Sequence, residues 1–219
     1  MAELADAADL KSAGLKNRVG SSPSPATREF MMPWLIVIVS YLLGSIPTAY
    51  LAGRIAAGRD IRKMGDRNAG AANAYRELNP AAGITVGLID AVKGAAVVLI
   101  ALAADMPQLI VLTAGLAAVI GHNWPVFLGF RGGRGVSTTL GVLLVLVTIP
   151  MLILALPTLL ILVWKRNVTP SMAFLFISLP VISWLLKVPP LLIGYGLALP
   201  VLIGITTWFR TRPKALKRA

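Results

Sequence analysis

The chain has 219 residues, of which 57% are hydrophobic and only 14% are charged, and its formal net charge is +12. Average soluble domains contain about 25% charged residues, so this composition excludes an ordinary soluble protein and favours a membrane-embedded one. The sequence contains no cysteine and one histidine, which excludes disulfides, thiol nucleophiles and a metal site built from several histidines.

The first 30 residues are polar and rich in small residues, with a Ser-Ser-Pro-Ser-Pro run before the first apolar segment. Such a composition is typical of a disordered tail. A cleaved secretory signal needs an early apolar core, whereas here the apolar run begins only near Met31. We therefore predict a disordered tail over 1–30 and a membrane domain over 31–219.

The apolar segments after this tail are continuous rather than alternating, which predicts spanning helices and not a barrel. A bilayer core about 30 Å thick needs about 20 apolar residues per helix. The fold class is therefore predicted to be an all-α bundle of about seven transmembrane helices. If Pro150 kinks one long helix instead of turning the chain back, the count falls to six. The expected spans are 33–55, 80–104, 107–121, 136–149, 150–164, 171–187 and 190–209.

Most of the 21 basic residues fall in alternate loops of this scheme. Because lysine and arginine accumulate in cytoplasmic loops, we predict an outside N-terminus and a cytoplasmic C-terminus. Topology alone accounts for Lys165, Arg166 and the basic run 210–218. Basic residues near the surface also attract anionic membrane lipids.

Two of the inner loops contain more than topology requires: residues 58–79 and residues 122–137. In the second loop, glycines would let consecutive N–H groups enclose an anion, while two arginines grip its oxygens. A helix beginning at Val136 would add its N-terminus and the Ser137 hydroxyl. A flexible turn with topogenic arginines is the alternative. The spacing matches neither nucleotide-binding glycine motif.

Three further residues are ionisable. His122 is either a hydrogen-bonding residue at a helix end or a catalyst. Asp90 and Lys93 lie three residues apart inside the second span, so they either pair with each other or face the bundle interior. An ionisable residue inside a membrane is a candidate for function by default.

Four segments together resemble one enzyme family: GSIPTAYLAGR (44–54), GRDIRKMGDRNAGAANAYR (58–76), LIDAVKG (88–94) and VIGHNWPVFLGFRGGRGVST (119–138). The family is the bacterial acyl-phosphate:glycerol-3-phosphate acyltransferases of the PlsY type. The resemblance implies a seven-span inner-membrane enzyme with cytoplasmic motif loops. It also implies transfer of an acyl group from acyl phosphate to the 1-hydroxyl of glycerol 3-phosphate, which gives lysophosphatidic acid and phosphate.

The same resemblance implies partners and residue roles. The partners would be the two substrates, membrane lipids and the enzyme that forms acyl phosphate, with no cofactor, metal or nucleic acid. The hydroxyl proton would pass to His122 or to the substrate phosphate. Arg131 and Arg134 would join His122 as catalytic residues. The substrate-binding residues would be Asn68, Asn73, Arg76, Gly132, Gly133, Gly135 and Ser137.

The chain departs from the family pattern in three places. Asp66 replaces a serine that donates to phosphate, and its carboxylate would repel phosphate unless Arg67 neutralises it. Ala72 replaces a threonine. Residues 203–219 lack the His, Asn and Glu of the family's third motif. An altered or inactive relative that binds phosphorylated lipid or uses another acceptor is therefore the alternative function. A small-anion transporter is a third reading, although the paired broken helices of such folds are missing.

Overall fold

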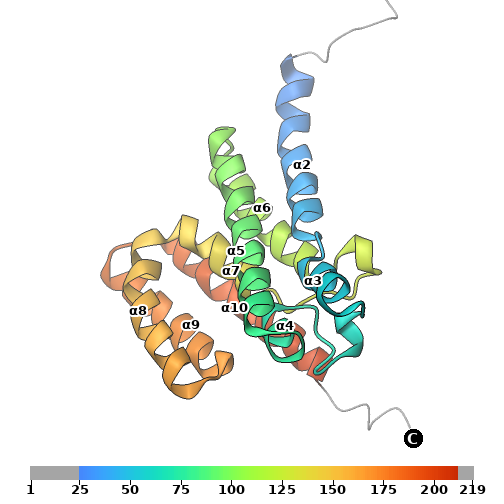
Figure 1. The fold of residues 1–219 in the computed structure, drawn as a ribbon. Coiled ribbons are helices and arrows are strands. Elements are labelled where there is room, and N and C mark those ends of the chain that lie inside the picture. Colours follow the sequence, from blue (N-terminus) through green and yellow to red (C-terminus); the bar gives the residue numbers. More distant parts are fainter. Residues whose placement is uncertain (1–24, 212–219) are drawn as a thin grey trace, which may run out of the picture. The chain divides into compact units, whose positions relative to one another are not determined.

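The computed structural model describes residues 25–211, and the described chain is helical throughout. Contacts divide the protein into a unit up to Leu35 and a unit from Ile36 onward. Residues 1–24 of the predicted tail, and the basic residues after Thr211, lie outside the described part. Figure 1 shows the elements, which are α2 (Pro25–Gly44), α3 (Thr48–Ala57), η1 (Ile61–Lys63), α4 (Ala71–Glu77), α5 (Pro80–Ala103), α6 (Gln108–Asn123), η2 (Val126–Leu128), α7 (Val136–Leu146), α8 (Thr148–Lys165), α9 (Val168–Leu185) and α10 (Pro190–Thr211).

Six segments are long and apolar enough to cross a membrane, among the residues that the structure describes. They are Met32–Ala57, Pro80–Ala103, Gln108–Leu128, Thr148–Lys165, Val168–Leu185 and Pro190–Thr211. The predicted span over 136–149 corresponds to α7, which has only 11 residues and is not among these six. At a rise of 1.5 Å per residue it measures about 16 Å, roughly half of a bilayer core.

The first predicted span differs from the observed helix in two ways. Helix α2 already begins at Pro25, so the last residues of the predicted tail, 25–30, belong to it. The span is then broken at 45–47, before α3 starts. Because Pro47 has no N–H to continue the helical ladder, the break leaves nearby carbonyls available. One of them, at Ile46, accepts a hydrogen bond from the buried Lys93.

The long apolar run after Val136 divides into two helices, as predicted. The break lies at Val147, where φ is −133° and ψ is 56°. Pro150 then sits in the first turn of α8, where its missing N–H costs no helical hydrogen bond. The proline therefore helps to start α8, while the turn itself is placed three residues earlier.

Glycines let the central helices approach closely. A Cβ at Gly141 of α7 would lie 1.8 Å from the carbonyl oxygen of Ala91 in α5, and one at Gly94 would lie 2.2 Å from that of Thr138. Small residues are the usual contact residues of membrane helices, because lipid removes the hydrophobic drive for packing. Helix α7 is thus held at the centre of its unit against α5 (Figure 1).

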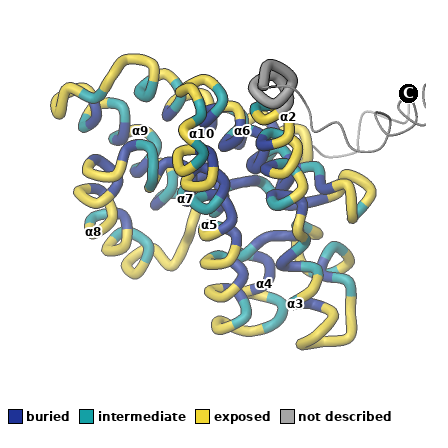
Figure 2. Tube along the Cα trace, turned by 90° about the horizontal axis from the view of Figure 1, so that it is seen from above, coloured by how far each residue is buried: buried dark blue, intermediate teal, exposed yellow. Residues whose placement is uncertain are grey.

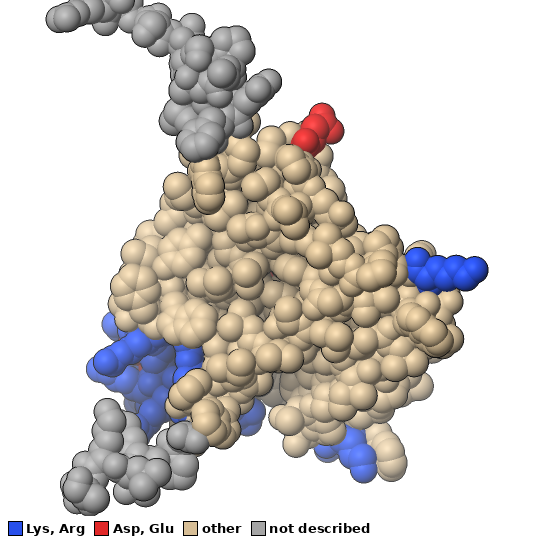
Figure 3. Space-filling view, turned by 180° about the vertical axis from the view of Figure 1, so that it is seen from behind, with Lys and Arg blue, Asp and Glu red and all other residues tan. Residues whose placement is uncertain are grey.

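The outer faces of the long helices carry exposed large apolar side chains. In Figure 2, where exposed residues are yellow, such stretches run along α8, α9 and α10. Figure 3 shows a broad surface free of charge, with lysine and arginine side chains gathered at its edges. A surface of this kind suits contact with lipid rather than with water.

Candidate functional site

The first of the two loops, residues 58–79, is shaped by a salt bridge at its start. The Asp60 carboxylate accepts the backbone N–H of Arg62 at 3.0 Å and pairs with its guanidinium at 2.8 Å. The hydrogen bonds from Arg62 hold the pKa of Asp60 below its usual range, and the carboxylate raises the pKa of Arg62. Arg62 also donates to the carbonyl of Leu128 at 3.0 Å, which joins this loop to the second loop, residues 122–137.

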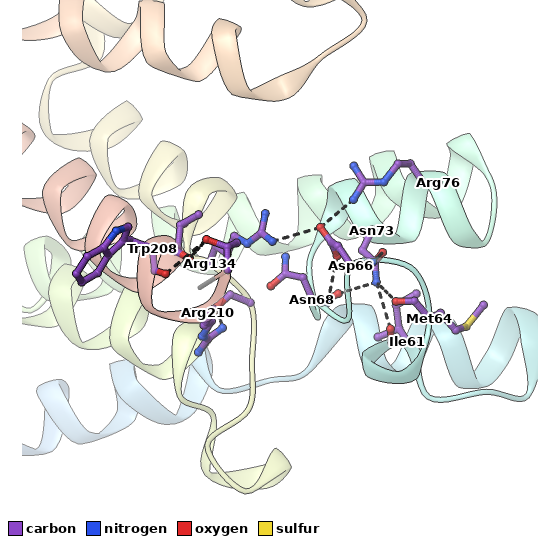
Figure 4. Close-up of polar contacts among 12 residues, drawn as sticks. Ile61, Met64, Asp66, Asn68, Asn73, Arg76, Arg134, Trp208 and Arg210 are labelled. Atoms are coloured by element: carbon purple, nitrogen blue, oxygen red, sulfur yellow. Dashed lines mark hydrogen bonds and ion pairs between the residues drawn. The ribbon is translucent and has the colours of Figure 1, made fainter. Parts of the chain in front are cut away.

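Asn73 holds the first loop closed from inside. Its side chain is fully buried. Its Oδ1 accepts the N–H of Asp66 at 3.3 Å, and its Nδ2 donates to the carbonyls of Ile61, Met64 and Asn68 at 3.2, 3.1 and 3.0 Å (Figure 4). The sequence predicted Asn73 as a substrate contact, whereas in the structure its amide is already engaged with the loop backbone.

The two loops meet at the Asp66 carboxylate. Its Oδ2 lies 2.9 Å from a guanidinium nitrogen of Arg76, in α4, and 3.3 Å from one of Arg134, in the second loop (Figure 4). Within the described chain, the ion-pair partners of Asp66 are therefore Arg76 and Arg134 and not the adjacent Arg67. Asp66 also accepts the N–H of Asn68 at 3.1 Å, which fixes the turn. Two guanidiniums far apart in sequence therefore converge on one anionic oxygen.

The glycines of the second loop serve close packing. The N–H of Gly132 donates to the carbonyl of Asn123 at 3.2 Å, and that of Gly133 to the carbonyl of His122 at 3.0 Å. The predicted anion cradle is therefore not built from these two N–H groups, since both already have acceptors. A Cβ at Gly133 would lie 2.0 Å from Nε2 of His122, so only glycine fits here.

Helix α7 begins directly after this loop. Gly135 precedes the helix with φ at 84°, a conformation that favours glycine. The first backbone hydrogen bond of this turn runs from the Thr139 N–H to the Gly135 carbonyl, so the N–H groups of residues 136–138 come before the helical ladder begins. Ser137 is half-buried in this turn. The positive end of α7 is thus placed next to Arg134.

A buried polar cluster lies beneath the loops. Oδ1 of Asp90 is 2.8 Å from Nζ of Lys93 and 3.6 Å from Nδ1 of His122, and it accepts the Thr48 hydroxyl at 2.8 Å. Lys93 also donates to Ile46 at the break in the first span. The two alternatives for Asp90 and Lys93 are therefore both realised, because the residues pair and also face the interior. The cluster orients the His122 ring.

A narrow crevice borders His122 on the side of the loops. It is lined by Gly44, Ser45, Ile46, Pro47, Thr48, Ala69, Pro125, Leu128, Gly132 and Gly133. A separate apolar cavity of about 200 Å³ lies among α5, α7, α8 and α9. In the part of the chain that the structure describes, no three His, Cys, Asp or Glu side chains gather closely enough to hold a metal ion.

One residue of the site was missed by sequence reasoning. Arg210, near the end of α10, donates to the carbonyls of Asn123, Gly132 and Gly133 and lies 5.9 Å from the centre of the Trp124 ring. The sequence assigned it to topology, as one of several C-terminal basic residues. Its partners are backbone carbonyls, which leave no pattern in the side chains that would reveal the contact.

The predicted site residues thus fall into two groups. Asp66 brings Arg76 and Arg134 together beside the α7 N-terminus, and Asn68 belongs to the same turn. Arg131 is exposed on the second loop. His122, Asn73 and the two central glycines lie below, where they support the loops from the inside.

Comparison with known proteins gives one consistent result. Residues 34–218 match a family model for glycerol-3-phosphate acyltransferase. The chain is 46% identical over 185 residues to glycerol-3-phosphate acyltransferase 4 of Dehalococcoides mccartyi (strain ATCC BAA-2266 / KCTC 15142 / 195), covering 84% of this chain and 100% of the relative. It is 40% identical to the enzyme of Halalkalibacterium halodurans, covering 82% and 88%.

Solved structures agree with this result. The crystal structure of PlsY (YgiH), an integral membrane glycerol 3-phosphate acyltransferase in its glycerol 3-phosphate form, superposes with a TM-score of 0.68 at 34% identity. The match covers 82% of this chain and 88% of that one. The lysophosphatidic acid form gives 0.66 at 32% identity. The described helices therefore form a multi-pass, integral membrane fold.

Proposed function

Because the chain belongs to the glycerol-3-phosphate acyltransferase family, we propose that it transfers an acyl group from acyl phosphate to the 1-hydroxyl of glycerol 3-phosphate. The products are lysophosphatidic acid and inorganic phosphate. The observation that carries this proposal is the convergence of Arg76 and Arg134 on one anionic oxygen. Such a pair suits substrates that both carry phosphate.

The phosphate of glycerol 3-phosphate binds where Asp66 now lies. Arginine guanidiniums grip phosphate oxygens bidentately, and two of them already point to this spot. Asp66 turns aside as the substrate arrives, because two anions in contact repel each other. Asn68, in the same turn, contributes a polar contact to the substrate.

The acyl phosphate binds beside it, against the second loop. Its phosphate is stabilised by the α7 N-terminus, by the Ser137 hydroxyl and by Arg131 and Arg134. Gly135 opens this helix end to the ligand. Gly132 and Gly133 act from below, because they let the loop lie directly on His122.

The chemistry needs no covalent enzyme intermediate, because an acyl phosphate is already a mixed anhydride with a good leaving group. The substrate hydroxyl attacks the acyl carbonyl, an ester C–O bond forms, and the C–O bond to phosphate breaks. The hydroxyl proton passes to His122 or to the departing phosphate. The chain's contribution is to align the hydroxyl with the carbonyl and to stabilise the developing negative charge.

We further propose that the site faces the cytoplasm of a bacterial inner membrane, with the N-terminus outside. The two inner loops and the end of α10 meet at one end of their unit, joined by Asp66 and Arg210. These segments contain eight of the 14 basic residues within 25–211, which supports a cytoplasmic location under the positive-inside rule.

The test is acyl transfer by purified protein in detergent. Phosphate release from palmitoyl phosphate should depend on added glycerol 3-phosphate and should fall in the Arg76→Met variant. A panel of other acceptors, such as glycerol and glycerol 2-phosphate, reports a change of acceptor. No release with any acceptor contradicts the proposal.

One observation favours a second candidate function. The Asp66 carboxylate already pairs with Arg76 and Arg134. The described end of α10 also lacks the His and Asn of the family's third motif. A relative that binds phosphorylated lipid without catalysis would tolerate both features. Growth of a bacterial strain lacking its own acyltransferase separates the two functions, because only an active enzyme rescues it.

A further inference from the structure

From α10, the Arg210 side chain donates hydrogen bonds to the glycine loop, which we define as residues 129–135. We propose that Arg210 is a positioning residue that locks this loop onto the end of α6 and so keeps the phosphate site for the acyl donor in shape. The proposal rests on the proposed function.

The guanidinium of Arg210 binds three carbonyl groups at once. Nη1 donates to Gly132 at 2.8 Å and also to Gly133, and Nη2 donates to Asn123. A planar guanidinium can reach acceptors on two sides through different nitrogens, whereas a lysine ammonium acts from one point. The geometry therefore requires arginine, not merely a positive charge.

The contact ties three elements together. Asn123 and His122 end α6, and their carbonyls accept the N–H groups of Gly132 and Gly133. The last carbonyls of a helix lack partners within it, and they form the negative end of its dipole. Arg210 brings a positive charge from α10 to this end of α6. One side chain thus joins α6, α10 and the glycine loop.

The loop held in this way carries the groups that the reaction uses. Gly133 lies against Nε2 of His122, the next residue is Arg134, and Gly135 immediately precedes α7. A shift of the loop therefore moves an arginine and a helix N-terminus in the same step. A misplacement of about 1 Å far from the chemistry can cost about 100-fold in rate.

The experiment compares Arg210→Ala and Arg210→Lys with wild type, varying palmitoyl phosphate and glycerol 3-phosphate separately. We expect Arg210→Ala to raise the KM for the acyl donor about tenfold or more, as for a lost charged hydrogen-bonding group, and to raise the acceptor KM as well, because Arg134 moves with the loop. Added guanidinium at low, non-denaturing concentration should restore part of the activity of Arg210→Ala. Lys165→Met is the matched control, because it removes a basic residue that stacks on Trp164 and not on the loop.

Hydrogen exchange gives a second measurement that needs no activity. Exchange should speed up at residues 129–135 in Arg210→Ala, while α8 and α9 stay as in wild type. Unchanged exchange at the loop, or KM values equal to wild type in a folded variant, overturns the proposal. If Arg210→Ala does not fold, the same two measurements on Arg210→Lys decide. An inactive wild-type protein with normal loop exchange would contradict the proposed function instead.

Discussion

Asp66 occupies the position where the phosphate of glycerol 3-phosphate is proposed to bind, so replacing it with serine should tighten acceptor binding. Its Oδ2 lies 2.9 Å from Arg76 and 3.3 Å from Arg134, and its side chain is 30% exposed. Two unit charges about 4 Å apart interact by about 1 kcal/mol in water and by about 4 kcal/mol at an effective dielectric constant of 20.

Because the Asp66 side chain is partly exposed, its interaction energy with each arginine lies nearer to the value in water. Its two ion pairs are each worth at most about 1 kcal/mol, and substrate phosphate replaces them. Removing the carboxylate should therefore favour acceptor binding by about 1–2 kcal/mol, which lowers the KM for glycerol 3-phosphate about 5- to 30-fold. The cost is a small loss of stability, because the two arginines then repel each other without substrate.

The assay is steady-state acyl transfer with glycerol 3-phosphate varied at saturating palmitoyl phosphate. Asp66→Asn should act like Asp66→Ser if charge is the cause, because it keeps the shape of the side chain. Asp105→Asn removes a carboxylate in the turn between α5 and α6 and should change nothing. An unchanged or higher KM in Asp66→Ser refutes the reasoning, since Asp66 would then organise the arginines for the substrate.

Two further predictions concern the support beneath the site. Gly133→Ala places a Cβ 2.0 Å from Nε2 of His122 and should lower kcat/KM about 100-fold. The control is Gly194→Ala, whose Cβ meets nothing within 4 Å, so kcat/KM should stay at the wild-type value. Equal activities of the two variants would contradict the packing role of Gly133. Asp90→Asn leaves buried Lys93 without its anion and should lower the free energy of unfolding by about 3–5 kcal/mol. Unfolding in detergent, followed by tryptophan fluorescence, measures this free energy. The double variant Asp90→Asn/Lys93→Met should recover part of the lost stability. A double variant less stable than either single variant would argue against the Asp90–Lys93 pair.

Hydropathy predicted the long helices well and the short ones less well. The segments 80–104 and 190–209 became α5 and α10 with ends shifted by a residue or two. The break at 45–47 and the shortness of α7 were not predicted. Hydropathy reports how readily a segment leaves water, and it does not report where a backbone ladder is interrupted.

The site could be located from sequence more easily than it could be described. Charge and glycine content indicated both inner loops, and the structure joins them through Asp66. The ion-pair partners of Asp66 and the backbone carbonyls that Arg210 binds come from distant parts of the sequence, and they meet only when the chain folds. Arg67, the local candidate for Asp66, has a left-handed backbone with φ at 59°, and the carboxylate pairs with Arg76 and Arg134 instead.

The most direct test of the account is to measure lysophosphatidic acid itself by mass spectrometry. Purified wild-type protein is supplied with palmitoyl phosphate and glycerol 3-phosphate and compared with Arg76→Met and Arg134→Met. The account predicts that wild type forms the product and that each variant needs at least about tenfold more glycerol 3-phosphate to do so, because each loses a charged contact to phosphate. Absence of product from the wild type, or the same acceptor KM in all three proteins, would contradict it.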